Sequence, residues 1–249
     1  MSVETTPSTR TAIVTGGTRG IGRAVSRRLA ADGFAVVAAY ANNQVEAAAT
    51  VKEIEDAGGR AIAVRADVAD EQAVAALFDT AEREFGGVDV VVNVAGRMPL
   101  APLAELDLAV LDDLYRVNVR GTFVVSQQAV RRIRDGGAIV NISSSVVKLA
   151  FPGYSAYAAT KGAVEAMTLV LARELRGRNV TVNVVAPGPT ATELFFDGKD
   201  EATVARLTAQ SPLERLGQPE DAANVVAFLA GPDGHWVNGQ VLRANGGVI

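Results

Sequence analysis

The feature that most restricts the fold of this chain is a regular alternation of short apolar strands with helices, from Thr11 almost to the C-terminus. Strands are predicted over 11–15, 34–40, 60–66, 88–93, 138–143, 180–186 and 240–243. Helices are predicted over 23–31, 44–57, 71–85, 108–134, 162–172 and 220–230. Several of the strands are continuously apolar, as strands buried on both faces are. The pattern therefore predicts an α/β fold with a parallel sheet.

No linker or shift in composition divides the chain, so we expect one domain over 11–249, preceded by a loose polar tail over 1–10. A (β/α)8 barrel has about this length and is the alternative fold. Two features argue against the barrel. Seven strands are predicted, and a glycine-rich turn follows the first strand, whereas a barrel would place its phosphate site late in the chain.

Charge and composition exclude several classes of function. The net charge is −4 and the pI is about 5.2, so the chain lacks the basic footprint of a nucleic-acid-binding protein. Cysteine is absent and His235 is the single histidine, which excludes thiol catalysis and multi-histidine metal sites. The polar opening residues do not form a signal peptide and no run is long enough to span a bilayer, so we expect a cytoplasmic protein.

The glycine-rich turn, Gly16-Gly-Thr-Arg-Gly-Ile-Gly22, lies between the first predicted strand and the first predicted helix. Small residues there let the backbone approach a pyrophosphate, and the helix N-terminus supplies N–H donors and positive potential. The spacing differs from the general G-x-G-x-x-G fingerprint. A tight turn that binds nothing is the alternative, but the strand–turn–helix context favours phosphate binding.

Tyr157 and Lys161 are four residues apart at the start of an Ala-rich helical stretch. On a helix they share one face, so the phenol and the ammonium can approach the same point. A phenol titrates near pH ~10 in water, and a nearby cation lowers its pKa. The two residues could form a general acid–base pair. Taken alone, they could also be a half-buried phenol and a solvated amine.

Together, Thr15–Gly22 and Tyr157-x-x-x-Lys161 resemble the motifs of the short-chain dehydrogenase/reductase family, and the resemblance covers essentially the whole chain after the tail. It implies a single-domain, doubly wound Rossmann fold with a seven-stranded parallel sheet flanked by helices. It also implies an enzyme that transfers a hydride between a nicotinamide cofactor and a carbonyl compound or alcohol.

The resemblance implies four catalytic residues, Asn118, Ser144, Tyr157 and Lys161. Ser144 stands thirteen residues before Tyr157, the usual family spacing, but serines flank it on both sides and the register could slip by one. In the family, Tyr157 would donate the proton and Ser144 would stabilise the carbonyl oxygen. Lys161 would bind the nicotinamide ribose and lower the pKa of Tyr157. Asn118 would hold a water that links Lys161 to solvent.

The cofactor-binding residues implied by the resemblance lie in several segments. Asp67–Val68 resembles the adenine-contacting pair, and Asn93–Gly96 resembles the family's N-N-A-G with Val94 in place of the second Asn. Pro187–Thr192 resembles the segment that holds the nicotinamide carboxamide. The full set is Gly16, Thr18, Arg19, Gly20, Ile21, Gly22, Tyr40, Asn42, Asn43, Asp67, Val68, Asn93, Ala95, Gly96, Tyr157, Lys161, Pro187, Gly188, Thr190 and Thr192. Each piece also has a structural interpretation; Asp67 or Asp70, for example, could cap the following helix.

The end of the second strand predicts the cofactor. A site that prefers NAD needs an acidic residue there, to accept a hydrogen bond from the adenosine ribose 2′-OH. No Asp or Glu occurs between Phe34 and Val45, and Tyr40 stands where the acid would be. Arg19 can reach the same corner and its guanidinium suits a phosphate, while Asn42 and Asn43 can add donors. We therefore expect NADPH and NADP+ as cofactors.

The second half of the chain is similar to NADPH-dependent aldehyde reductase-like members, although Ala244-Asn-Gly-Gly247 departs from the commoner D-G-G ending. An NADPH-dependent carbonyl reductase is therefore the leading hypothesis. The alternatives are 3-oxoacyl-(acyl-carrier-protein) reductase, whose acidic partner would need a basic surface such as the arginines of 131–134 or 176–178, and a non-catalytic NADP-binding sensor or scaffold.

Three segments, 97–107, 146–154 and 194–210, are expected to line the substrate pocket. Phe195 and Phe196 could anchor the third segment to the core, but we expect at least one of them to cover the substrate as part of a mobile lid. That arrangement favours apolar or aromatic carbonyl compounds. The helices near 108–134 and 156–176 carry apolar residues on more than one face, and similar family members pair those helices across two-fold axes. The resemblance therefore implies a homotetramer, or a homodimer.

Overall fold

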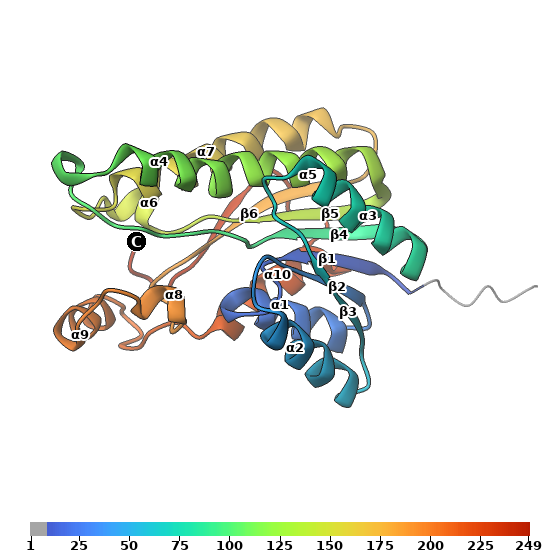
Figure 1. The fold of residues 1–249 in the computed structure, drawn as a ribbon, viewed down its shortest axis with the longest axis horizontal. Helices are drawn as coiled ribbons and strands as arrows, with labels where there is room; N and C mark the ends of the chain where they lie inside the picture. The colour runs from blue at the N-terminus through green and yellow to red at the C-terminus, as the bar shows by residue number, and fades with distance from the viewer. Residues whose placement is uncertain (1–8) are drawn as a thin grey trace, which may run out of the picture.

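A computed structural model describes residues 9–249 and confirms the predicted parallel sheet (Figure 1). The strands are β1 (Thr11–Thr15), β2 (Ala35–Tyr40), β3 (Arg60–Arg65), β4 (Val88–Asn93), β5 (Ile133–Ile142), β6 (Thr181–Pro187) and β7 (Val241–Ala244). They form one sheet in the order β3-β2-β1-β4-β5-β6-β7, and every neighbouring pair is parallel. The sheet is open and its order reverses between β1 and β4, so the fold is doubly wound and the barrel is excluded.

Helices cover both faces of the sheet (Figure 1). One face is covered by α1 (Gly20–Ala31), α2 (Gln44–Asp56) and α10 (Pro219–Ala230). The other face is covered by α3 (Glu71–Phe85), α4 (Leu108–Tyr115), α5 (Gly121–Arg132) and α7 (Ser155–Glu174). Among the described helices, none is both long and apolar enough to cross a lipid bilayer.

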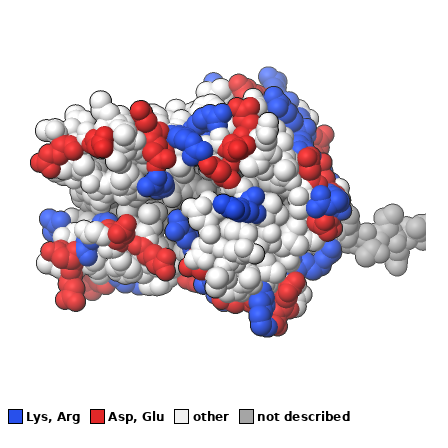
Figure 2. Space-filling model, in the orientation of Figure 1, with Lys and Arg blue, Asp and Glu red and all other residues white. Residues whose placement is uncertain are grey.

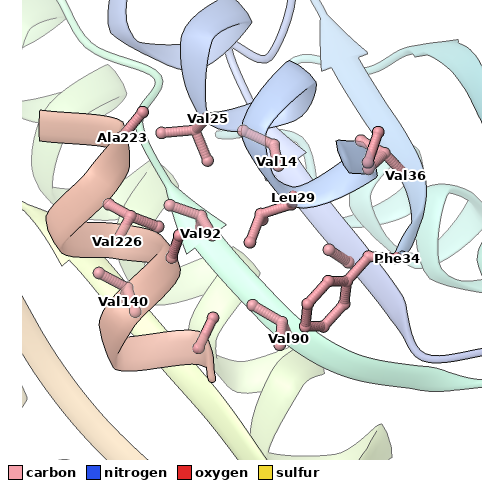
Figure 3. Close-up of a cluster of buried hydrophobic side chains, with 14 of the residues drawn as sticks. Val14, Val25, Leu29, Phe34, Val36, Val90, Val92, Val140, Ala223 and Val226 are labelled. Carbon is pink, nitrogen blue, oxygen red and sulfur yellow. The ribbon is translucent and has the colours of Figure 1, made fainter. Parts of the chain in front are cut away.

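Two apolar clusters, one on each side of the sheet, hold these layers together. Under α1 and α10, Leu29 and Val226 are fully buried against the side chains of β1, β4 and β5 (Figure 3). On the other side, Leu77 and Phe78 of α3 are fully buried as well. Truncating such a side chain to Ala lowers the free energy of unfolding by about 2–5 kcal/mol. This packing keeps the strands, and hence their ends, in a fixed arrangement.

The carboxyl ends of the strands meet at one edge, where the chain forms several short elements that the sequence analysis did not predict (Figure 1). These are η1 (Leu103–Glu105), α6 (Val146–Leu149), α8 (Glu193–Phe196) and α9 (Glu201–Ala209). A further 3-10 turn, η3 (Pro232–Gly234), precedes β7. Except for α9, which has nine residues, each element is too short for its hydrophobic periodicity to be recognised in the sequence.

The single helix predicted over 108–134 is wrong in two respects. A π-helical segment, η2 (Arg116–Arg120), separates α4 from α5, and β5 begins at Ile133, which is buried in the core. The segments on both sides of this turn are helical, so the helical character of the sequence alone does not reveal the turn between them. Asn118 lies inside this turn.

The expected loose tail over 1–10 lies mostly outside the described residues. Arg10, its last residue, already belongs to the fold. The Arg10 guanidinium lies 4.7 Å from the centre of the Phe34 ring, and the Arg10 carbonyl accepts a hydrogen bond from the Ala35 amide. The ordered domain therefore includes Arg10.

Candidate active site

A cavity of about 1390 Å³ opens at the carboxyl edge of the sheet, beside the point where the strand order reverses. Figure 2 shows the hollow at this end of the molecule, between the layer of α4 and α6 and the layer of α8 and α9. Doubly wound sheets bind their ligands at this position. The glycine-rich turn, the carboxyl ends of β2, β3, β5 and β6, the segment after β4, and the short helices α6, α8 and α9 all contribute to its wall.

The glycine-rich turn is shaped for a close backbone approach. Gly16 adopts a φ of +62°, which L side chains rarely tolerate, and a Cβ on Gly22 would lie 1.9 Å from the Gly16 carbonyl oxygen. The turn delivers the chain into α1, whose N-cap residue Arg19 makes no side-chain capping bond within the described structure. By contrast, Asn43 caps α2 and Asp70 caps α3.

The first turn of α1 also contains no acidic residue. Its N–H groups and positive potential therefore face the cavity without a competing acceptor, as an anion-binding helix N-terminus requires. This arrangement fits the pyrophosphate of a dinucleotide. The residues present are thus compatible with the cofactor that the sequence predicts.

Tyr157 and Lys161 lie on the cavity wall, one turn apart near the N-terminus of α7. Their exposed fractions are 8% and 5%, so both are buried in the subunit. The Lys161 ammonium donates a hydrogen bond of 2.8 Å to the Ile142 carbonyl, and it lies 5.7 Å from the centre of the Tyr157 ring. The structure therefore places the two side chains on the same side of α7, as their spacing predicts, with the ammonium beside the Tyr157 ring.

Burial determines the pKa values of both groups. Burial raises the pKa of Tyr157 to about 12, although a hydrogen bond with Ser144 acts in the opposite direction. Burial also lowers the pKa of Lys161 to about 8. The expectation that Lys161 lowers the pKa of Tyr157 is therefore corrected for this structure, because the loss of hydration on burial dominates and raises that pKa.

The three consecutive serines after β5 have different hydrogen-bond partners. Only the Ser144 hydroxyl acts on the Tyr157 phenol. The Ser143 hydroxyl donates a 2.7 Å hydrogen bond to Glu165 of α7, and the Ser145 hydroxyl donates to the carbonyl of Ala186. Ser144 is thus the serine positioned to contact a substrate oxygen beside the phenol.

Asn118 lies behind the cavity wall and is 1% exposed. Its side-chain oxygen accepts a bond from the Arg97 amide, and its NH2 group donates to the Arg97 carbonyl and the Thr160 hydroxyl. A Cβ on Gly96 would lie 3.3 Å from the Asn118 oxygen and 3.7 Å from the Lys161 nitrogen. The amide therefore braces the segment that follows β4, next to Lys161.

Of the predicted cofactor-binding residues, all except Asn93 lie on the cavity wall. Asn93 is 6% exposed, and its NH2 group donates to Asn141 at 2.8 Å and to Ser126 at 3.3 Å. It ties β4 to the neighbouring β5 and to α5 within the layers of the fold. The motif pattern could not distinguish this internal role from a cofactor contact.

The end of β2 forms the corner where a 2′-phosphate or a 2′-hydroxyl would lie. Tyr40, Asn42 and Arg19 all line it, and Arg19 is exposed. The Asn43 side-chain oxygen is committed to capping α2, since it accepts from the Glu46 amide at 3.1 Å. Glu46 also lies on this wall, just beyond the acid-free stretch from Phe34 to Val45, and the sequence did not indicate its part in the site.

Asp67, predicted to contact adenine, is paired with Arg116 of η2 and accepts a bond from the Ala69 amide at 2.9 Å. Burial favours the neutral acid, but these bonds and the charges of Arg116 and Arg120 prevail and lower the pKa of Asp67 below its ordinary value. Arg116 lines the cavity as well, and its part in the site was also missed. Neither a motif nor periodicity marks this arginine.

The segment after β6 faces the glycine-rich turn across the cavity. A Cβ on Gly20 would lie 3.3 Å from the Thr192 methyl group, and a Cβ on Gly188 would lie 2.9 Å from Asn245. The Asn245 NH2 group donates a 3.0 Å hydrogen bond to the Ser145 hydroxyl. The unusual Ala244-Asn-Gly-Gly247 ending therefore joins the end of β7 to the loop that carries Ser144.

Aromatic side chains line the remaining part of the cavity, beyond Tyr157. Phe151 and Tyr154 form one edge-to-face pair with ring centres 5.8 Å apart, and Phe195 and Phe196 form another at 5.3 Å. Phe195 is 9% exposed and Phe196 is 45% exposed. Parts of all three predicted segments line the cavity, including Met98, Leu149 and Leu207.

The sequence matches known proteins over almost its whole length. A family model described as Enoyl-(Acyl carrier protein) reductase matches residues 16–249. The chain is 47% identical to a short-chain type dehydrogenase/reductase of Picea abies, over 96% of this chain and 92% of that protein. It is 42% identical to a chloroplastic NADPH-dependent aldehyde reductase-like protein of Arabidopsis thaliana, over 96% and 94%. It is 39% identical to the 3-oxoacyl-(acyl-carrier-protein) reductase FabG of Staphylococcus aureus, over 96% and 98%.

Solved structures give the same match. A dehydrogenase/reductase of Sinorhizobium meliloti superposes with a TM-score of 0.92 at 42% identity, over 96% of this chain and 94% of that chain. A short-chain dehydrogenase of Burkholderia cenocepacia, solved in complex with NADP, superposes with a TM-score of 0.90 at 40% identity, over 97% and 98%.

Proposed function

Since this chain belongs to the short-chain dehydrogenase/reductase family and is an NADP-dependent oxidoreductase, we propose that it reduces an aldehyde or a ketone to an alcohol with NADPH. The observation that carries this proposal is the buried Tyr157 phenol on the cavity wall, next to Ser144 and one turn from Lys161. These are the groups that a reduction of a carbonyl needs.

In the proposed reaction the bound cofactor supplies a hydride to the carbonyl carbon. Tyr157 gives its phenolic proton to the carbonyl oxygen, so that C=O becomes CH–OH, while Ser144 donates a hydrogen bond to the same oxygen. The raised pKa of Tyr157 keeps the phenol protonated at neutral pH, as a general acid must be. A proton relayed past Lys161 then returns Tyr157 to the neutral form, and Asn118 keeps Lys161 and the segment after β4 in place.

The cofactor would lie along the wall that the family motifs line. The turn from Gly16 to Gly22 and the N-terminus of α1 would hold the pyrophosphate, Asp67 and Val68 the adenine, and the segment from Pro187 to Thr192 the nicotinamide. At the end of β2, Tyr40 replaces the acid that an NAD site uses, and Arg19 supplies a cation. The proposed site therefore prefers NADPH to NADH.

The aromatic end of the cavity favours an apolar or aromatic carbonyl substrate. The buried Phe195 ring anchors α8 to the rest of the subunit, while the exposed ring of Phe196 is free to cover a substrate. A panel of purified carbonyl compounds, followed by the loss of NADPH absorbance, tests the proposal. Faster reduction of aromatic aldehydes than of free sugars is expected, and equal catalytic efficiency on both would contradict this substrate class.

Reduction of a 3-oxoacyl group on an acyl-carrier protein is the second candidate, and the similarity to the Staphylococcus aureus reductase supports it. The two basic clusters, at 131–134 and 176–178, do not support it. Arg132, Arg134 and Arg178 are paired with acidic residues, and both clusters lie where α5 and α7 end, at the edge of the sheet opposite the cavity. Reduction of acetoacetyl-CoA at a rate well above that of aromatic aldehydes would reverse this order.

We also propose self-association, as a homotetramer or a homodimer. Large apolar side chains are exposed on the helices above the sheet, including Leu108 of α4, Phe123 of α5 and Val170 of α7. Two-fold packing of these helices would remove that surface from water. Light scattering at micromolar concentration measures the mass directly, and a monomeric mass would contradict the proposal.

A further inference from the structure

Arg65, the last residue of β3, lies at the corner of the cavity where the ribose of a bound NADPH would be. Arg65 is in register with Tyr40, the last residue of β2. Its Nε donates a hydrogen bond of 3.0 Å to the Ala41 carbonyl, in the loop that continues from β2. Arg65 and Tyr40 line the cavity together with Arg19 and Asn42.

The bond to Ala41 holds the guanidinium in place but uses only its Nε–H. Within residues 9–249, no carboxylate forms an ion pair with Arg65 or with Arg19. Arg116, on the same wall, is instead neutralised by Asp67. The terminal N–H groups and the charge of Arg65 are therefore available to a ligand, and the bond to Ala41 already limits the orientations of this exposed guanidinium.

Glu46 stands on the same wall and its negative charge opposes a phosphate. One arginine would only balance this acid, whereas two leave the corner with a net positive charge. We propose that Arg65 acts with Arg19 to bind the 2′-phosphate of NADPH and so determines cofactor specificity. The proposal rests on the NADPH-dependent function proposed above and adds a residue from a second strand to the specificity site.

Binding of cofactor fragments tests this without turnover. Calorimetric titration compares 2′,5′-ADP, which carries the 2′-phosphate, with 5′-AMP, which differs from it only in lacking that phosphate. Arg65→Gln is expected to weaken the binding of 2′,5′-ADP about tenfold, the effect of one charge-assisted hydrogen bond, and to change the affinity for 5′-AMP by less than about twofold. The affinity of the variant for 2′,5′-ADP is also expected to depend less on salt.

Arg60→Gln is the matched control. Arg60 is exposed at the other end of β3, where its guanidinium lies 5.2 Å from the centre of the Phe85 ring, so both fragments are expected to bind this variant as they bind the parent. If Arg65→Gln loses affinity for both fragments equally, or loses no affinity for 2′,5′-ADP, the assignment is overturned. In either case carbonyl reduction by the parent would stand, because it is measured separately with substrate and cofactor.

Discussion

The ammonium of Lys161 donates its hydrogen bond to the Ile142 carbonyl, 2.8 Å away at the carboxyl end of β5. This contact places a lysine that is 5% exposed between the end of a core strand and the ring of Tyr157. Burial lowers its pKa to about 8, whereas a lysine in an unfolded chain titrates near pH ~10.4. The folded protein without cofactor therefore carries this charge at an energetic disadvantage.

The sign of the resulting pH dependence follows from linkage. Below about pH 8 Lys161 is charged in both states, and the folded state bears the full penalty, of the order of 3 kcal/mol. Between about pH 8 and ~10.4 the unfolded state binds more protons, so the penalty disappears as pH rises. We predict that Lys161→Met makes the protein without cofactor more stable than the parent at pH ~7, and that this gain shrinks towards pH ~10.

Urea unfolding of the two proteins at both pH values measures this difference. Lys52→Met serves as the control, since Lys52 has a side chain that is 74% exposed and its pairing with Asp56 contributes little. A stability difference between Lys161→Met and the parent that does not vary with pH would refute the effect of burial on Lys161.

The serine register gives a second prediction. Ser144→Ala removes a donor aimed at the substrate oxygen, and we expect kcat to fall by roughly 10²–10³ with little change in KM. Ser143→Ala removes a hydroxyl that bonds Glu165, so it should lower stability by about 1 kcal/mol and change kcat only a few-fold. Steady-state kinetics of both variants, together with thermal melting, distinguish them. A larger kcat loss in Ser143→Ala would show that the register is shifted by one.

The cofactor corner gives a third prediction. We expect the parent to prefer NADPH over NADH by at least about tenfold, since one charge-assisted hydrogen bond contributes about 1.5–3 kcal/mol. Arg19→Ala should lower kcat/KM for NADPH by about the same factor and leave the value for NADH nearly unchanged. Comparison of kcat/KM for both cofactors checks this. An unaltered ratio in Arg19→Ala would remove this residue from the specificity site.

The two adjacent phenylalanines give a fourth prediction, because their burial differs. Phe196→Ala should lower kcat/KM for an aromatic aldehyde more than for a small aliphatic aldehyde, with little effect on the melting temperature. Phe195→Ala should lower the melting temperature, because the Phe195 ring anchors α8 and is 9% exposed. If Phe196→Ala reduces both aldehydes like the parent, Phe196 does not cover the substrate.

Most of the fold could be predicted, because strands buried on both faces leave a strong apolar pattern. The boundaries of β1 and α3 agree with the predicted ranges 11–15 and 71–85. The break at η2 was missed, since the segments on both sides of it, α4 and α5, are helical. The short helices at the carboxyl edge were missed because four residues, as in α8, carry no measurable period.

Residues of the cavity wall could be predicted where a sequence motif specifies them. They were missed where only the packing of separate elements brings them to the wall. Tyr157 and Lys161 lie together because helix geometry joins residues four apart. Arg65 and Glu46 come from different elements, and a sequence does not show that the end of β3 and the start of α2 meet at one corner. Asn93 is the opposite case: it belongs to a recognised motif, but its side chain donates to Asn141 of the neighbouring strand and does not line the cavity.

The measurement that tests the central claim most directly compares Tyr157→Phe with the parent on the best carbonyl substrate. The variant keeps the ring but removes the proton that Tyr157 is proposed to donate. We predict that Tyr157→Phe binds NADPH with nearly the parental Kd, measured by fluorescence titration, and that its kcat falls by at least about 10²-fold. Near-parental turnover in the variant would contradict the account of Tyr157 as the general acid.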